Sequence, residues 1–159
     1  MSTFKLQPVP LSVKGKKFAI VASRFNNDLC EELIAGATET LAAHGVTPDS
    51  VTIHRCPGAF EIPMLAFKVI DETEVDAVIC LGAVVKGDTP HFDFVAGSCA
   101  SGIMQVAIET GIPVIFGVLT TNNDEQAWER ADRKRMNKGG ESALTAMEMA
   151  DSFSKLERK

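Results

Sequence analysis

The feature that most constrains the fold of this chain is an alternation between short apolar runs and longer segments with helical spacing. The apolar runs are rich in β-branched residues and cover residues 18–22, 51–53, 75–85 and 114–119. The first, third and fourth runs are apolar at nearly every position, which is typical of strands covered on both faces. Strands that alternate with helices in this way form one parallel sheet, because the crossovers between them are right-handed.

Each helical segment has an apolar stripe and signals for its ends. Asp28 is expected to cap the first helix, with Glu31 reaching back, and Gly45 follows its end. Pro63 suits the first turn of the second helix, and Gly111 stops the third. The residues predicted to face the core are Leu29, Leu33, Ala37 and Leu41, then Met64, Phe67 and Ile70, then Val95, Cys99, Ile103 and Val106, and finally Ala143, Met147, Ala150 and Phe153.

A chain of 159 residues is about one domain long. We therefore predict a single α/β domain over residues 17–159, with three α/β/α layers around a four-stranded parallel sheet. Residues 1–16 are predicted to form an N-terminal arm. Its segment 3–13 is interrupted by two prolines, so it is expected to be an edge strand on this sheet or on that of a neighbouring subunit.

The composition excludes several classes of protein. The hydrophobic content of 45% and charged content of 23% are ordinary for a soluble globular protein. A net charge of -5 argues against nucleic acid as a partner, because phosphate backbones select basic surfaces. The longest apolar run, residues 77–85, is less than half a membrane span, and the first 17 residues do not resemble a signal peptide. We expect a cytoplasmic protein without a membrane partner.

The cysteines and histidines give no sign of a disulfide framework or a metal site. Cys30, Cys56, Cys80 and Cys99 are far apart and contain no Cys-x-x-Cys pair. Reduced thiols in a cytoplasmic protein are the simplest interpretation, with Cys80 as a small core residue. No two histidines have metal-ligand spacing, so we predict no metal.

Unusual residue clusters follow each of the apolar runs. They cover residues 23–26, 56–61, 82–91 and 120–122. In open parallel sheets, ligands bind at the carboxyl ends of the strands, near the point where strand order reverses. The sequence therefore predicts a binding site at that edge of the sheet.

The cluster around Gly87 combines features of an anion site. Gly87, Asp88 and Thr89 precede a helix whose first amides carry a partial positive charge, which suits a phosphate. His91 lies in the first turn of that helix and can move protons near neutral pH. The alternatives are a simple loop turn and a capping or surface histidine.

Two further side chains have both a functional and a structural interpretation. Phe25, at a strand end, can stack on a flat heterocycle beside the hydrogen-bonding Asn26, or it can simply cover the sheet. Glu61 can accept hydrogen bonds from polyol hydroxyls, or it can be a charge in a first helical turn. The charge run at residues 129–138 is mostly expected to be a solvated helix face, from which one or two cations can reach an anion.

In combination, the motifs of this chain resemble the lumazine synthase family over residues 17–156. The matching motifs are Ser-Arg-Phe-Asn at 23–26, Pro-Gly-Ala-Phe-Glu-Ile-Pro at 57–63, Gly-Asp-Thr-Pro-His-Phe-Asp at 87–93, Phe-Gly-Val-Leu-Thr-Thr at 116–121 and Asn-Lys-Gly at 137–139. The resemblance implies a flavodoxin-like fold. It also implies condensation of 5-amino-6-ribitylaminouracil with 3,4-dihydroxy-2-butanone 4-phosphate, giving 6,7-dimethyl-8-ribityllumazine, phosphate and water without a cofactor or metal.

The same resemblance implies a role for each site residue. The pyrimidine and its ribityl chain would be bound by Phe25, Asn26, Ala59, Phe60, Glu61, Ala83, Val84 and Val85, with Phe116 and Lys138 from the adjacent subunit. Phosphate would be held by Gly87, Asp88, Thr89 and, again from the adjacent subunit, Arg130. His91 would move protons during Schiff-base formation and phosphate elimination. The enzyme would thus be a homo-oligomer, a pentamer or a multiple of pentamers, acting on two small molecules.

Two departures from the family pattern stand out. Lys86 replaces an arginine that often precedes the Gly-x-Thr turn, and residues 132–136 replace a glycine-rich link between the last two helices. The second departure favours a pentamer over a closed 60-subunit shell. Two other functions remain open at this point: a flavodoxin-like domain that binds a flavin or lumazine without turnover, and a shell or scaffold protein without activity.

Overall fold

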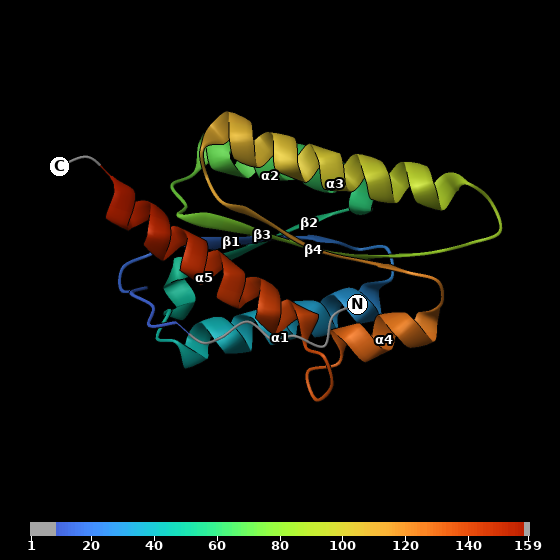
Figure 1. The fold of residues 1–159 in the computed structure, drawn as a ribbon, viewed down its shortest axis with the longest axis horizontal. Coiled ribbons are helices and arrows are strands. Elements are labelled where there is room, and N and C mark those ends of the chain that lie inside the picture. Colours follow the sequence, from blue (N-terminus) through green and yellow to red (C-terminus); the bar gives the residue numbers. More distant parts are fainter. Residues whose placement is uncertain (1–8, 158–159) are drawn as a thin grey trace.

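Four strands form one fully parallel sheet with helices on both faces in a computed structural model that describes residues 9–157 (Figure 1). The strands are β1 (Phe18–Ser23), β2 (Val51–Cys56), β3 (Ala77–Val85) and β4 (Val114–Thr121). Their order is β2-β1-β3-β4, so the strand order reverses between β1 and β3. The predicted three-layer, flavodoxin-like α/β/α architecture is therefore confirmed.

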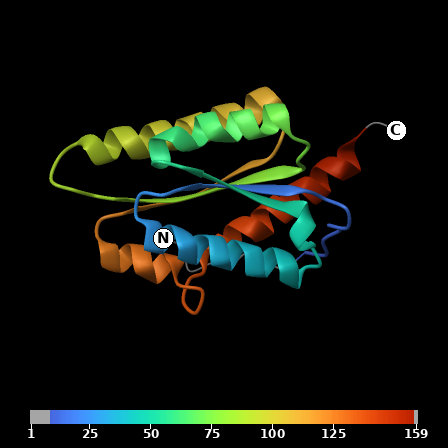
Figure 2. The same ribbon diagram turned by 180° about the vertical axis from the view of Figure 1, so that it is seen from behind.

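The helices divide between the two faces of the sheet. They are α1 (Asn27–Ala43), α2 (Ile62–Glu72), α3 (His91–Thr110), α4 (Asp124–Ala131) and α5 (Lys138–Leu156), with short 3-10 turns η1 (Pro48–Ser50) and η2 (Ala59–Glu61). Figure 1 shows α2 and α3 on one face and α1, α4 and α5 on the other, and Figure 2 shows the same layers from behind. Each face covers its own apolar cluster.

The burial of each strand follows its place in the sheet. All six residues of the inner strand β1 are buried, and so are the first seven of β3. Edge strand β2 is half-exposed along most of its length. The partly exposed His54 and Arg55 explain why the apolar pattern stops after residue 53, because an edge strand carries polar residues where it meets solvent.

The start of α1 differs from the prediction. Asn26, not Asp28, precedes the helix, and it has the left-handed conformation with φ 57° and ψ 51°. Its side chain makes no cap, because its Nδ2 instead donates to the Ala83 carbonyl oxygen at 2.9 Å. Asp28 lies inside the first turn, where its charge is still favourable for the helix dipole.

The predicted core stripe of α2 is wrong for two of its three residues, while the third, Ile70, packs partly buried against the core. Met64 is 71% exposed and Phe67 is 44% exposed, whereas Ile62, Ala66 and Val69 are buried. The helix is apolar on more than one side, so spacing alone cannot tell which side meets the sheet. In α3 and α5 the predicted stripes are mainly buried, although Phe153 near the end of α5 is exposed and Val95 is only partly buried.

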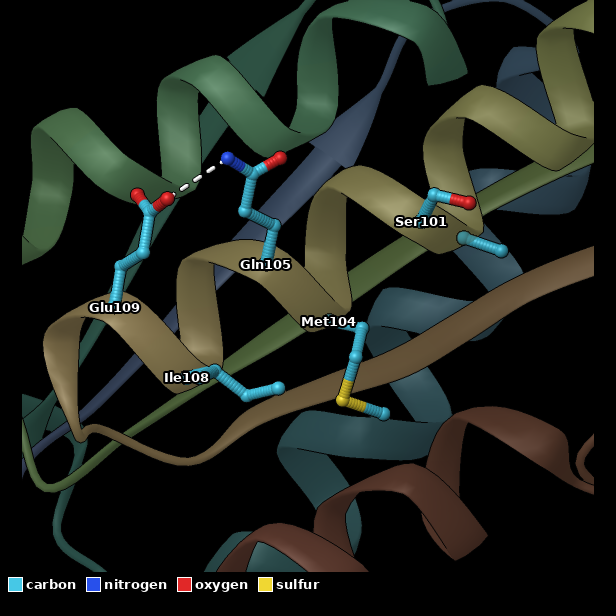
Figure 3. Close-up of a pocket in the computed structure, with 6 residues that line it drawn as sticks. Ser101, Met104, Gln105, Ile108 and Glu109 are labelled. Carbon is cyan, nitrogen blue, oxygen red and sulfur yellow. Dashed lines mark hydrogen bonds between the residues drawn. The ribbon is translucent and has the colours of Figure 1, made fainter.

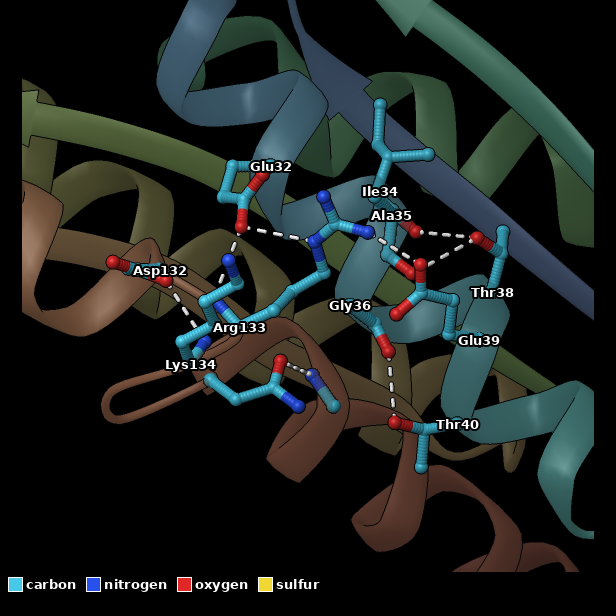
Figure 4. A network of polar contacts seen from close by, with 12 residues as sticks. Glu32, Ile34, Ala35, Gly36, Thr38, Glu39, Thr40, Asp132, Arg133 and Lys134 are labelled. Carbon is cyan, nitrogen blue, oxygen red and sulfur yellow. Dashed lines mark hydrogen bonds and ion pairs between the residues drawn. The ribbon is translucent and has the colours of Figure 1, made fainter.

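The charge run at residues 129–138 is not one helix face. Helix α4 ends at Ala131, and a link of residues 132–137 leads to α5. Arg133 anchors this link to α1: its backbone N and its Nε donate to Glu32 Oε1 at 3.0 and 2.9 Å, and its guanidinium also pairs with Glu39 (Figure 4). These ion pairs are tertiary contacts that a local sequence pattern does not contain.

The beginning of α5 is packed tightly against α1. A Cβ added at Gly139 would lie 2.1 Å from the Leu33 carbonyl oxygen, so only glycine allows this approach. Asn137 caps α5 through Oδ1, which accepts from the Gly140 amide at 3.0 Å. The Asn-Lys-Gly motif at 137–139 therefore fixes where α5 begins, and Lys138 with it.

The predicted edge strand at residues 3–13 lies partly outside the described residues, which begin at 9. Residues 9–13 are not part of the sheet. No helix among residues 9–157 is long and apolar enough to span a membrane. In the same part of the chain, no three His, Cys, Asp or Glu side chains are grouped as metal ligands would be.

Candidate active site

A cavity of about 550 Å³ opens at the carboxyl edge of the sheet, where strand order reverses. Its volume lies in the usual range for small-molecule sites. Three segments far apart in sequence form its walls. The lining residues are Phe25, Asn26, Gly58, Ala59, Phe60, Glu61, Ala83, Val84, Val85, Gly87, Thr89, His91, Phe92, Phe94 and Val95. The cavity thus brings together most of the residues that the sequence singled out.

The turn between β1 and α1 is tied to the end of β2. The Arg24 amide donates to the Cys56 carbonyl oxygen at 2.8 Å, and the Phe25 amide donates to the Pro57 carbonyl oxygen at 2.9 Å. These bonds extend the β1–β2 pairing past the strand ends. The Phe25 ring itself is 72% exposed. One of its faces is thus open to a planar ligand.

The segment after β2 forms a short 3-10 turn at the cavity wall. Glu61 Oε2 accepts a hydrogen bond from the Gly58 amide at 3.0 Å, which closes the turn. Glu61 thus has a structural contact other than the predicted dipole interaction, and its carboxylate also lines the cavity. Ala59 is buried beneath it, while Phe60 projects into solvent.

The third wall comes from the end of β3 and the connection to α3. The Lys86 amide donates to the Thr121 carbonyl oxygen at 2.8 Å, which continues the β3–β4 pairing. Beyond it, the connection extends past the layers of the fold before α3 begins (Figures 1 and 2). Thr89 Oγ1 accepts from the His91 amide at 3.4 Å, so His91 opens α3.

Four predicted site residues do not line this cavity. Asp88 lies in the β3–α3 connection but outside the lining. Phe116 is an exposed residue near the middle of edge strand β4. Arg130 donates to the Gln126 carbonyl oxygen at 2.9 Å on α4, and Lys138 pairs with Glu141 at 2.7 Å on α5. Helices α4 and α5 cover the face of the sheet that lies opposite α2 and α3.

Sequence reasoning missed Gly58, Phe92, Phe94 and Val95 as cavity residues. Val95 was assigned to the core stripe, and it does pack partly against the core. The sequence did contain a signal for Phe94 as a site residue. Phe92 and Phe94 both lie close to His91 in the first turn of α3. An exposed aromatic residue in that position is unusual for a helix that covers a sheet.

The thiols near the cavity are not nucleophiles. Burial raises the pKa of Cys56 to about 11, and burial also raises the pKa of Cys30. Both thiols are engaged as well: Cys56 Sγ donates to the Gly58 carbonyl oxygen at 3.4 Å, and Cys30 Sγ donates to that of Phe25 at 3.4 Å. At neutral pH these groups are protonated, so covalent thiolate chemistry is excluded here.

A second hollow, on the outer surface of α3, is not built for binding. All its lining residues come from one helix: Ala100, Ser101, Met104, Gln105, Ile108 and Glu109. Its polar groups satisfy each other, since Gln105 Nε2 donates to Glu109 Oε1 at 2.8 Å (Figure 3). No groups converge from several directions, as they do at the carboxyl edge.

Comparison with known proteins agrees with the site's composition. The family model described as 6,7-dimethyl-8-ribityllumazine synthase matches residues 15–154. The 6,7-dimethyl-8-ribityllumazine synthase of Chlorobium luteolum is 51% identical over 143 residues, covering 90% of this chain and 92% of its own. That of Chlorobium limicola is 50% identical with the same coverage. The chain therefore belongs to the 6,7-dimethyl-8-ribityllumazine synthase family, whose members are transferases of riboflavin biosynthesis.

Proposed function

We propose that this chain condenses 5-amino-6-ribitylaminouracil with 3,4-dihydroxy-2-butanone 4-phosphate to give 6,7-dimethyl-8-ribityllumazine, phosphate and water. The observation that carries the proposal is the cavity at the reversal of strand order, which holds an open aromatic ring, a glycine-threonine turn and an imidazole. Membership in the family supports it. Most of the rate enhancement comes from placing two reactive molecules together, with modest acid–base help.

The half of the cavity next to Phe25 suits the pyrimidine and its ribityl chain. Phe25 offers an aromatic face for stacking, and Ala83, Val84 and Val85 present the wall beside it. One N–H of Asn26 Nδ2 is already committed to the Ala83 carbonyl oxygen, which leaves the side-chain amide oxygen and the second N–H for a ligand. Ala59, Phe60 and Glu61 form the remaining wall, where a polyol chain finds a carboxylate acceptor.

The half next to His91 suits the phosphate. A side chain at Gly87 would meet open space, so packing within the described residues does not require a glycine there. Close approach of a ligand to the backbone would explain why this position is a glycine. Gly87, Asp88 and Thr89 then hold the phosphate near the start of α3, and His91 moves protons as the Schiff base forms and phosphate leaves.

The working form proposed here is a homo-oligomer, a pentamer or a multiple of pentamers, with shared sites. Phe116, Arg130 and Lys138 lie outside the cavity of their own chain and would enter that of a neighbour. Large apolar side chains are exposed beside the cavity and on α2, α3 and β4, as expected of a surface that a second copy covers. They are Phe25, Phe60, Met64, Phe67, Phe94, Met104, Ile108 and Phe116.

Arg130 is the cation best suited to the phosphate, because its planar guanidinium can donate two parallel hydrogen bonds. We also propose that the protein works in the cytoplasm. All four cysteines are free and buried, which suits a reducing compartment.

The direct test is an assay of the purified protein with both substrates, following fluorescent lumazine and free phosphate. We expect both products in equal amounts. Binding of lumazine without turnover would support the flavodoxin-like carrier instead. A defined oligomer with neither binding nor turnover would support the scaffold protein.

Complementation tests the shared site. Phe25→Ala and Arg130→Ala subunits are each expected to be nearly inactive alone. In rings assembled from equal amounts of both, about a quarter of the contacts would pair a normal Phe25 with a normal Arg130. Co-expressed subunits should therefore regain substantial activity. Mixed rings, verified by mass, that show only the sum of the residual rates would rule out a shared site.

A further inference from the structure

Arg55, near the end of β2, reaches across to the turn between β1 and α1. Its Nη2 donates to the Ser23 carbonyl oxygen at 3.0 Å and to Asn27 Oδ1 at 3.0 Å. Its Nη1 pairs with the Glu31 carboxylate. The arginine side chain is only 25% exposed. One guanidinium thus joins the end of one strand to the first two turns of a helix.

The partners of Arg55 enclose the segment that lines the cavity. Ser23 is the last residue of β1 and Asn27 the first of α1, so only residues 24–26 lie between them. From the β2 side, the Cys56 and Pro57 carbonyl oxygens accept from the amides of residues 24 and 25. The short turn is therefore held at both of its ends and along its backbone.

This turn needs such support. Asn26 has the left-handed conformation, which is unfavourable for a residue with a side chain. The Phe25 ring makes few contacts of its own, because it is largely exposed. The direction of the ring is therefore decided by the backbone of the turn and not by packing around the ring.

Stability alone does not explain an arginine at this position. Its Nε is buried without a hydrogen-bond partner among the described residues, which carries a desolvation cost. An ion pair that is replaced as a whole by well-packed apolar residues often leaves a fold as stable as before, so stability does not require the Arg55–Glu31 pair. What an apolar side chain cannot do is bind the carbonyl of Ser23 and the side chain of Asn27 at once.

We propose that Arg55 is a positioning residue: it holds Phe25 at the orientation in which the ring stacks on the substrate's pyrimidine. The proposal rests on the stacking role given to Phe25 in the proposed function. Arg55 itself does not line the cavity. Asn26, the other cavity residue of this turn, is held separately by its own bond to the Ala83 carbonyl oxygen. The effect of Arg55 on ligand binding should therefore pass through Phe25.

A double-mutant cycle tests this route. The probe is 6,7-dimethyl-8-ribityllumazine, whose binding is followed by fluorescence anisotropy without turnover. Arg55→Met should weaken binding roughly tenfold, in line with the loss of charge-assisted hydrogen bonds that orient a contact. In a Phe25→Ala background the same substitution should change the dissociation constant by less than about twofold, because effects that share one route are not additive.

His54→Ala is the matched control on the same strand. Within the described residues its ring is hydrogen-bonded only to Thr52 Oγ1, at 3.1 Å, so binding should stay within about twofold of wild type. If Arg55→Met does not fold, Asn27→Ala removes a single contact of the same guanidinium. It should weaken binding about threefold with Phe25 present and leave it unchanged in Phe25→Ala.

Two results would overturn the proposal. One is wild-type affinity in Arg55→Met, and the other is an equal loss of affinity in both backgrounds. The proposed function is judged separately, by turnover of the wild-type protein. A protein that forms lumazine but shows independent effects of Arg55 and Phe25 loses only the positioning role.

Discussion

Two segments at the same edge of the sheet line the cavity, and they are held very differently. The turn at residues 23–27 is fixed by backbone bonds to β2, by Arg55 and by the Asn26 amide on Ala83. The connection at residues 87–90 is hydrogen-bonded only to the start of α3 among the described residues: the His91 amide donates to Thr89 Oγ1 at 3.4 Å, and the Asp93 amide donates to the Pro90 carbonyl oxygen at 3.0 Å. Both segments line the same cavity.

The difference suits the two ligands that we propose. A flat ring gains most from a surface that is already oriented, because ordering a side chain on binding reduces affinity. A phosphate is held by several donors at once, and the open connection offers only some of them. On this view the aromatic half is already oriented within one chain, and Phe116 and Lys138 of a neighbouring copy would add to it. The phosphate half would depend on a neighbouring copy for its cation, Arg130.

The largest effect is expected at the open half. His91→Ala should lower turnover by roughly 10- to 1000-fold while fold and assembly persist, because one general acid–base group is lost. Steady-state kinetics across neutral pH would measure this. His44→Ala serves as control, since His44 lies at the far end of α1 and contacts the Thr40 carbonyl oxygen. Kinetics unchanged by loss of His91 would remove it from the mechanism.

A selective effect is expected for Arg130→Ala. The Michaelis constant for the butanone phosphate should rise about 10- to 100-fold, corresponding to a lost charge-assisted contact, with a much smaller change for the pyrimidine. Arg135→Ala is the matched control, because Arg135 also pairs with Glu129 but lies on the link. Equal changes for both substrates would mean that Arg130 acts through structure, and the contrast between the two halves would disappear.

The packing of Gly139 against α1, which fixes the start of α5 and the place of Lys138, can be tested through the stability of the protein. Gly139→Ala would force a Cβ against the Leu33 carbonyl oxygen, so the free energy of unfolding should fall by about 1–3 kcal/mol. Urea unfolding measures it. Gly97→Ala, in the open part of α3, is the control and should be neutral or stabilising by up to about 1 kcal/mol. Equal stability of the two variants would show that α5 is not held tightly at its start.

The smallest effect on stability is expected from the ion pair between Glu32 and Arg133, which anchors the link of residues 132–137 to α1. This effect depends on pH. Hydrogen bonds from Arg133 hold the pKa of Glu32 below its ordinary value. The stabilisation by this carboxylate is then complete above the ordinary glutamate pKa, and it is lost as pH falls through the lowered value in the folded protein. Glu32→Gln should therefore be less stable than wild type at neutral pH, and the difference should shrink in acid.

Urea unfolding between neutral pH and about pH 3 would follow that difference. Glu74→Gln is a suitable control, because Glu74 is highly exposed and pairs only weakly with Lys17 at 3.6 Å. A difference between Glu32→Gln and wild type that stays constant with pH would show that the ion pair with Arg133 does not anchor the link.

The sequence predicted the order of strands and helices along the chain. It also predicted the edge of the sheet at which the cavity lies. Apolar runs and helical spacing are local properties, and β1 and β3 are buried on both faces, so their patterns are strong. Glycines, prolines and polar clusters after the strands are local too. Resemblance to a family then assigned roles to residues such as Phe25 and His91, which the structure places in one cavity.

Other features were decided only in three dimensions. Which side of α2 faces the sheet depends on the neighbours of that helix, so Ala66 is buried while Met64 is exposed. The left-handed Asn26 follows from a bond to Ala83, 57 residues away. Likewise, Arg133 contacts Glu32 across 101 residues. Local sequence patterns determine which segments form strands and helices. The positions of the side chains named above are instead set by contacts that form only when these elements pack together.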